Sequence, residues 1–147
     1  MTLYGENFVR NRLVNDATYG NTDTGCGSRV YPEIAPQRAD MPFAVVRVRP
    51  ETPSHHLLNE AGVTDCRVEV STYGTNYDDI RNLANAARLA VSNQRGDFTI
   101  DGESIFIQSC RLEETRPEHL RDEGGEETGI FEFNQTFRVW YNTTNPS

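Results

Sequence analysis

The sequence contains no lysine: all 14 basic residues are arginine, set against 22 acidic residues, and the formal net charge is −8. This shortage of positive charge argues against a sequence-independent nucleic-acid binder, which needs a basic face to displace counterions. No stretch approaches the roughly 20 apolar residues that span a bilayer, and the N-terminus has no basic or apolar signal region. We therefore expect no membrane association.

Cysteine is also scarce. Cys26, Cys66 and Cys110 are far apart, odd in number, and form no Cys-x-x-Cys pair, which argues against a disulfide framework or a zinc cluster. Cys66 and Cys110 fall within strand-like runs, where we expect small buried side chains. Cys26 lies between two glycines in an expected loop. The pattern suits a reducing compartment.

Motifs for catalysis are missing. The sequence has no Gly-x-Ser-x-Gly, no His-Glu-x-x-His and no glycine-rich phosphate loop. His55 and His56 are adjacent in a proline-flanked loop with no third metal ligand at a suitable spacing, and His119 lies in an acidic segment. We expect no catalytic residue, no metal and no cofactor, and hence not an enzyme.

A length of 147 residues suits one domain with its own core, so we expect a single domain over residues 1–147. Three polar stretches are expected to be loop insertions, at about 16–27, 50–64 and 113–129. Between them the pattern predicts, in order, a helix (2–15), a short strand (29–31), two strands (43–49, 65–73), a helix (76–93), a hairpin through Asp101-Gly102 (98–112) and a long strand (130–141).

Two patterns set the expected architecture. Residues 65–73 alternate between apolar and polar, which is typical of a strand with one buried and one wet face. Ile80, Leu83, Ala84, Ala87 and Val91 form one apolar stripe on the second helix, with Thr75 or Asn76 as its cap. We predict an α+β fold: a mostly antiparallel β-sheet with two α-helices packed on one face and a long strand at the C-terminus.

Two features could serve contacts with other molecules. Arg138 and Trp140 lie on the polar side of the last strand, and both residue types are enriched at protein interfaces. The segment 113–129 holds seven acidic residues. Its spacing matches no Ca²⁺ loop, so we interpret it as solvated or partner-contacting, with cation binding or carboxylate catalysis as the alternative.

Several short segments occur together in a recognisable order. They are Val30-Tyr31-Pro32, Ala35-Pro36-Gln37, Met41-Pro42-Phe43-Ala44-Val45-Val46, Arg67-Val68-Glu69-Val70-Ser71-Thr72-Tyr73-Gly74, Ala84-x-x-Ala87-Arg88, and Phe137-Arg138-Val139-Trp140-Tyr141. Over roughly residues 3 to 141 the chain resembles the tail-terminator or tail-completion family of long-tailed phages and related particles.

The resemblance implies a ring, usually of six subunits, that caps the head-proximal end of the tail tube and joins it to the head or neck. Its partners would be further copies of itself, the tail-tube protein and neck or head-completion proteins, with DNA passing nearby in the lumen. The protein would be made in the host cytoplasm and end in the virion. As interface residues we predict Arg47, Arg49, His55, His56, Glu118, Arg121, Arg138 and Trp140.

Three other functions stay open at this stage. A head-completion or neck ring protein would share the architecture, since fold does not fix function. A carboxylate-based enzyme would need two acids converging in a pocket with shifted pKa values. A ligand-binding domain would be a monomer with a closed apolar pocket.

Overall fold

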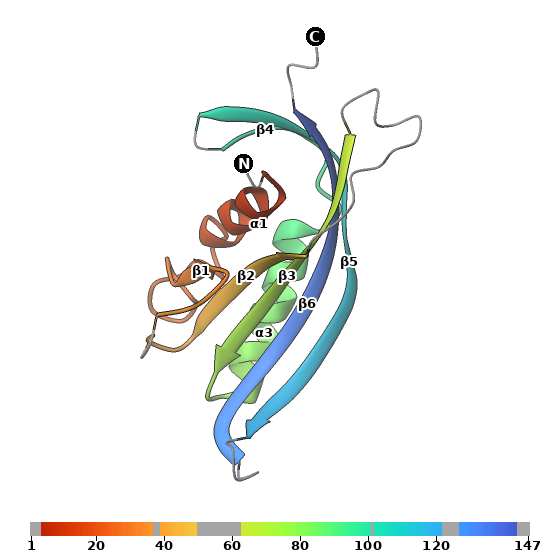
Figure 1. Cartoon of the computed structure of the whole chain (residues 1–147). Helices are drawn as coiled ribbons and strands as arrows, with labels where there is room; N and C mark the ends of the chain where they lie inside the picture. Colours follow the sequence, from red (N-terminus) through yellow and green to blue (C-terminus); the bar gives the residue numbers. More distant parts are fainter. Residues whose placement is uncertain (1–3, 37–38, 50–62, 101, 122–126, 144–147) are drawn as a thin grey trace.

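The computed structural model describes residues 4–36, 39–49, 63–100, 102–121 and 127–143. They form two helices and six strands (Figure 1). In chain order these are α1 (Tyr4–Val14), β1 (Val30–Pro32), β2 (Phe43–Arg49), β3 (Val63–Gly74), α3 (Tyr77–Val91), β4 (Gly96–Ile100), β5 (Glu103–Arg121) and β6 (Glu127–Thr143). The predicted α+β class is confirmed, as is the order of elements.

The strands make one sheet in the order β1-β2-β3-β6-β5-β4. All pairs are antiparallel except β1 with β2, which run parallel with Val30 beside Ala44. The long β5–β6 hairpin projects beyond the end of β3 and α3 (Figure 1). Because β4 pairs only with residues 103–107 of β5, the outer edge of β5 beyond Ile107 faces no other described strand.

Helix α3 begins where the sequence predicts. The Asn76 side chain accepts a hydrogen bond from the Asp79 amide at 3.0 Å, and Asp78 and Asp79 complement the positive end of the helix dipole. Its apolar stripe is buried against the sheet. The Gln135 Nε2 on β6 donates to the Ala84 carbonyl at 2.9 Å, which ties helix to strand.

Helix α1 packs on the same face of the sheet. A Cβ at Gly5 would lie 2.4 Å from the Cys66 Sγ, so the helix approaches β3 closely enough that only glycine fits. The core between helices and sheet includes Phe8, Val68 and Phe137, all fully buried. No helix among the described residues is both long and apolar enough to span a membrane.

The three cysteines are buried free thiols, as expected for Cys66 and Cys110. Burial raises the pKa of Cys110 to about 12, with a smaller contribution from neighbouring Cys66. Burial likewise raises the pKa of Cys26 to about 12, against the opposing effects of Tyr19 and Arg29. A thiol with so high a pKa holds almost no nucleophilic thiolate at neutral pH, so these residues serve packing.

Segment 16–27 contains only turns, as predicted, yet part of it belongs to the core. Tyr19 and Cys26 are fully buried, and the Tyr19 hydroxyl hydrogen-bonds to the Thr72 Oγ1 on β3 at 2.5 Å. Two side chains hold the turns: Asp16 Oδ2 accepts from the Tyr19 amide at 2.9 Å and Asn21 Oδ1 from the Asp23 amide at 2.8 Å. The segment therefore anchors the sheet and is not a surface appendage.

The prediction of a loop at 113–129 was wrong for residues 113–121, which continue β5, and for 127–129, which begin β6. Residues 122–126 lie outside the described residues. A Glu-rich composition and a proline at 117 are typical of a loop, but an edge strand tolerates both. The outer edge of β5 beyond Ile107 faces no other described strand, so an amide is not needed there for pairing. Of the loop predicted at 50–64, residues 63 and 64 belong to β3, and 50–62 lie outside the described residues.

Candidate protein interface on the outer face of the sheet

The sheet face turned away from the two described helices is the candidate site, and we call it the outer face. Alternate residues of each strand point to it, in register across β2, β3, β6 and β5. Its charged residues are six arginines and six carboxylates: Arg47, Arg49, Arg67, Arg111, Arg116 and Arg138, with Asp65, Glu69, Glu113, Glu114, Glu118 and Glu132. Their formal charges cancel, although the whole chain carries −8.

Aromatic side chains occupy one part of the outer face. The Phe43 ring on β2 stacks on Tyr73 of β3 at 5.0 Å between centroids, and Tyr31 of β1 lies 6.3 Å from Phe43. All three rings are partly exposed. Partly exposed Tyr, Phe and Trp together with Arg are the residue types enriched at the centres of protein interfaces.

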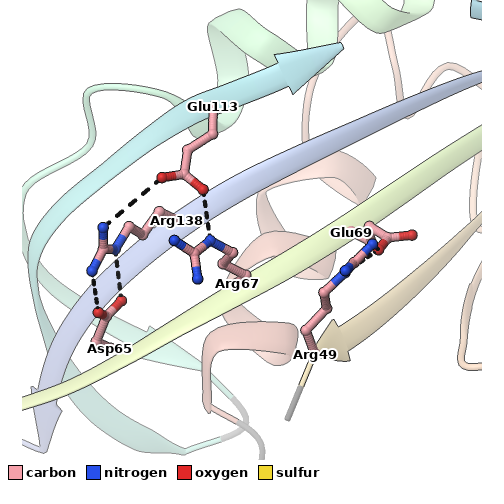
Figure 2. Close-up of polar contacts among 6 residues, drawn as sticks. All are labelled: Arg49, Asp65, Arg67, Glu69, Glu113 and Arg138. Carbon is pink, nitrogen blue, oxygen red and sulfur yellow. Dashed lines mark hydrogen bonds and ion pairs between the residues drawn. The ribbon is translucent and has the colours of Figure 1, made fainter. Parts of the chain in front are cut away.

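A network of ion pairs crosses three strands of the outer face (Figure 2). Arg138 on β6 donates to both carboxylate oxygens of Asp65 on β3, at 3.0 and 2.5 Å, in the two-pronged geometry that guanidinium favours. Its third nitrogen lies 4.0 Å from Glu113 on β5, and Glu113 also accepts from Arg67 at 2.8 Å. The network fixes the side chains in place, so a partner would meet an ordered surface.

Trp140 is held by this network. The Arg138 guanidinium carbon lies 5.1 Å from the centre of the indole ring, in cation–π contact, and Asp65 is the cross-strand partner of Trp140. The indole Nε1 is buried and has no hydrogen-bond partner among the described residues. A donor without an acceptor is costly, since it has lost its bond to water.

A second ion pair joins Arg49 on β2 to Glu69 on β3 (Figure 2). Glu69 also accepts from the Asn134 amide at 3.1 Å, and the same amide donates to the Ser71 Oγ at 2.9 Å. Burial by itself raises the pKa of Glu69, but the hydrogen bonds from Asn134 and Arg49 and the charges of Arg49 and Arg47 outweigh it. The net result is a pKa below the usual range.

This lowered pKa gives a testable pH dependence. A carboxyl whose pKa falls on folding contributes stability above its unfolded pKa, and that contribution is lost as the pH falls through the folded pKa. We expect Glu69→Gln to unfold at a lower urea concentration than the wild type at pH 7, and this difference to shrink below about pH 4. Urea unfolding from pH 3 to 7 measures it; a difference that is constant with pH would contradict the assignment.

The structure places five of the eight predicted interface residues on one face. Arg47, Arg49, Glu118, Arg138 and Trp140 all lie on the outer face, with Arg138 and Trp140 in direct contact. Arg121 is the last residue of β5, and its side chain is outside the described set. His55 and His56 lie outside the described residues. The role of all eight in an interface stays a prediction.

The predicted interface residues do not include the partners that organise this face. The alternation in 65–73 predicts Arg67 and Glu69 on the wet face of that strand, and the period of two extends this to Asp65. Glu113 could not have been found in this way, since it lies at a register shift between Leu112 and Glu114. Among the residues that the structure describes, no three His, Cys, Asp or Glu side chains group to hold a metal ion.

The outer face combines ordered arginine side chains with partly exposed aromatic rings, and these residue types are enriched at protein interfaces. Residues 9–142 match the family model described as "Tail completion protein gp17", and the chain belongs to this family. It is thus a structural component of a phage-like virion tail.

A solved structure shares the fold. It is a chain from a structure titled "Virion of native gene transfer agent (GTA) particle", 16% identical in sequence, with a TM-score of 0.57 over 91% of each chain. At this level of identity the likeness concerns the fold alone. No curated protein matches the sequence.

Proposed function

We propose that the protein forms a ring of six subunits that caps the head-proximal end of the tail tube, ends tube polymerisation and joins the tail to the neck. Membership of the tail completion family supports a role at the end of the tail. The observation that carries the proposal is the outer face, whose side chains are fixed by ion pairs and whose composition suits a protein partner.

The outer face is proposed to contact the end of the tail tube. Its six arginines and six carboxylates can pair with a mixed-charge surface without leaving a net charge buried. Trp140 and the Tyr31–Phe43–Tyr73 cluster supply apolar area beside these charges. A few aromatic and arginine side chains that become buried usually supply most of the binding energy at a protein interface.

The charge of −8 suits a position beside the DNA conduit. Since the formal charges of the outer face cancel, the excess acid resides on the remainder of the chain. If part of that remainder borders the lumen, like charge keeps passing DNA from adhering to the wall.

The test is the mass of the purified protein, alone and mixed with its tail-tube protein, by light scattering and negative-stain microscopy. Six subunits of 16.6 kDa give a ring of about 100 kDa. We expect such rings, or tubes of uniform length with a capped end. A protein that ignores tubes but binds the portal would be a neck protein instead. A monomer that binds neither would favour the ligand-binding or enzymatic function.

A further inference from the structure

A groove on the helix side of the molecule lies between α3 and the β5–β6 hairpin. Its volume is about 180 Å³, and two arginines line it together with apolar and neutral polar residues: Arg81, Ala84, Asn85 and Arg88 of α3, Thr115 of β5, and Phe133 and Gln135 of β6. No carboxylate of the described residues lines it. The groove adjoins the part of β5 whose outer edge faces no other described strand, so a neighbouring subunit can approach it there.

The arginines of this groove are weakly engaged within the chain. Arg81 and Arg88 are seven residues apart on one stripe of α3, about 10 Å along the helix axis. Arg81 has a long, exposed ion pair with Asp78 at 3.8 Å, and Arg88 donates to the neutral Asn85 Oδ1 at 2.9 Å. Both remain available to a carboxylate from outside.

The opposite margin of the sheet presents an apolar side chain and a carboxylate on one turn. Strand β1 forms that margin, and residues 33 and 34 follow it directly (Figure 1). Ile34 is 77% exposed, more than any other large hydrophobic side chain among the described residues. Glu33 is exposed as well, and its carboxylate pairs with no other described residue. The turn therefore carries two side chains that the subunit itself leaves unused.

This turn is held in a conformation that residues other than glycine rarely adopt. Glu33 has a φ of 66°, in the left-handed region. Its amide donates to the Val46 carbonyl at 2.9 Å, and its carbonyl accepts from the Arg47 Nε at 3.0 Å. The Ile34 amide donates to the Pro32 carbonyl at 2.7 Å. Backbone strain that the surrounding structure maintains clusters at functional sites, and here it fixes an exposed apolar side chain in advance of binding.

The turn and the groove are complementary in charge and polarity. Ile34 offers an aliphatic side chain to the apolar wall at Ala84 and Phe133, and Glu33 offers a carboxylate to the two arginines. They cannot meet within one subunit, because β6 is three strand spacings from β1, about 14 Å at about 4.8 Å per spacing. The occupant that fits is therefore the turn of a second copy of the chain.

We propose that in the ring the Glu33–Ile34 turn of each subunit binds the Arg81–Arg88 groove of the next, and we call this contact the seam. It joins two different surfaces at opposite margins of the sheet, and heterologous contacts of this kind generate rings when the rotation between subunits closes. The inference rests on the proposed ring. Neither the turn nor the groove includes a residue of the outer face, so the seam and the tube-binding surface can be tested separately.

The experiment compares ring formation by light scattering, and capping by negative-stain microscopy with the tail-tube protein, for variants of both surfaces. We expect Ile34→Ala, Glu33→Arg and Arg88→Glu each to raise the protein concentration needed for rings about tenfold or more, because an anchor is lost or like charges meet. The combined variant Glu33→Arg with Arg88→Glu should recover rings. Arginine and glutamate both carry a Cβ, so Glu33→Arg leaves the strain at residue 33 in place.

Two substitutions outside the seam serve as matched controls. Leu89→Ala removes an apolar side chain of 62% exposure from α3, and Arg95→Glu reverses the charge of an exposed arginine. Neither residue lines the groove. Both variants should form rings at the wild-type concentration.

The outcomes separate the seam from the ring. Rings that persist unchanged in all three single variants would overturn the seam and leave the ring standing. Normal rings that no longer cap tubes would mean that these residues contact the tube protein, which also overturns the seam. Failure of the combined variant to recover rings, while circular dichroism shows it folded, would overturn it too. A wild type that forms no ring, alone or on tubes, would sink both hypotheses.

Discussion

Replacing Trp140 with alanine is expected to abolish tube capping at concentrations where the wild-type protein caps every tube. Truncating a central aromatic residue of an interface costs about 2 kcal/mol or more, which weakens binding by about 30-fold. Trp140 fits this role because it is partly exposed, lies against Arg138 and has an indole N–H without an acceptor among the described residues.

Two further variants make the test specific. Arg138→Lys keeps the charge but loses the two-pronged bond to Asp65, so it should weaken capping less than Trp140→Ala does. Leu89→Ala removes an apolar side chain of 62% exposure from α3, on the helix side, and should cap normally. Capping is counted by negative-stain microscopy over a titration. Wild-type capping by a folded Trp140→Ala would show that the outer face does not bind the tube.

The outer face is ordered by contacts between strands that are far apart in sequence, such as Arg67 with Glu113 and Arg138 with Asp65.

Much of the fold could be predicted because local patterns and tertiary burial agree. The alternation in 65–73 and the stripe on α3 each indicate one structure, and the structure has it. Of the predicted Asp101-Gly102 turn, Gly102 is described and has a φ of 81°. The second strand of the hairpin at 98–112 was predicted, but the extension of β5 over residues 113–121 could not be. Residues 113–118 are all exposed, and an edge strand that is exposed on both faces requires neither apolar alternation nor an absence of proline. Composition alone therefore suggested a loop.

The candidate site was predictable only in part, for a related reason. Arg138 and Trp140 share a strand, so their common face follows from the period of two. Their neighbours depend on register: Glu113 reaches the outer face at an irregularity in the β5–β6 pairing, and Asp65 reaches Arg138 across 73 residues of sequence. Register is set by the whole hydrophobic pattern and the turns, and no local motif reports it.

Gly20→Ala is expected to destabilise the protein by about 3 kcal/mol, a large share of the stability of a domain of this size. A Cβ at this position would lie 2.0 Å from the Val14 carbonyl oxygen and 2.9 Å from that of Asp16. Both are backbone atoms near the end of α1, so the clash cannot be relieved by turning a side chain. The Gly20 amide also donates to the Asp16 carbonyl at 2.9 Å. This hydrogen bond keeps residue 20 close to the end of α1.

The loss would extend beyond the turn, because the neighbouring residue is an anchor of the core. If Gly20 moves, Tyr19 can no longer keep both its burial and its hydrogen bond to Thr72. Urea unfolding measures the effect, with the exposed Thr22→Ala as a control that should change stability by less than about 0.5 kcal/mol. Equal stability of the two variants would contradict the prediction, because it would mean that the turn accommodates a Cβ at residue 20 without disturbing the packing of Tyr19.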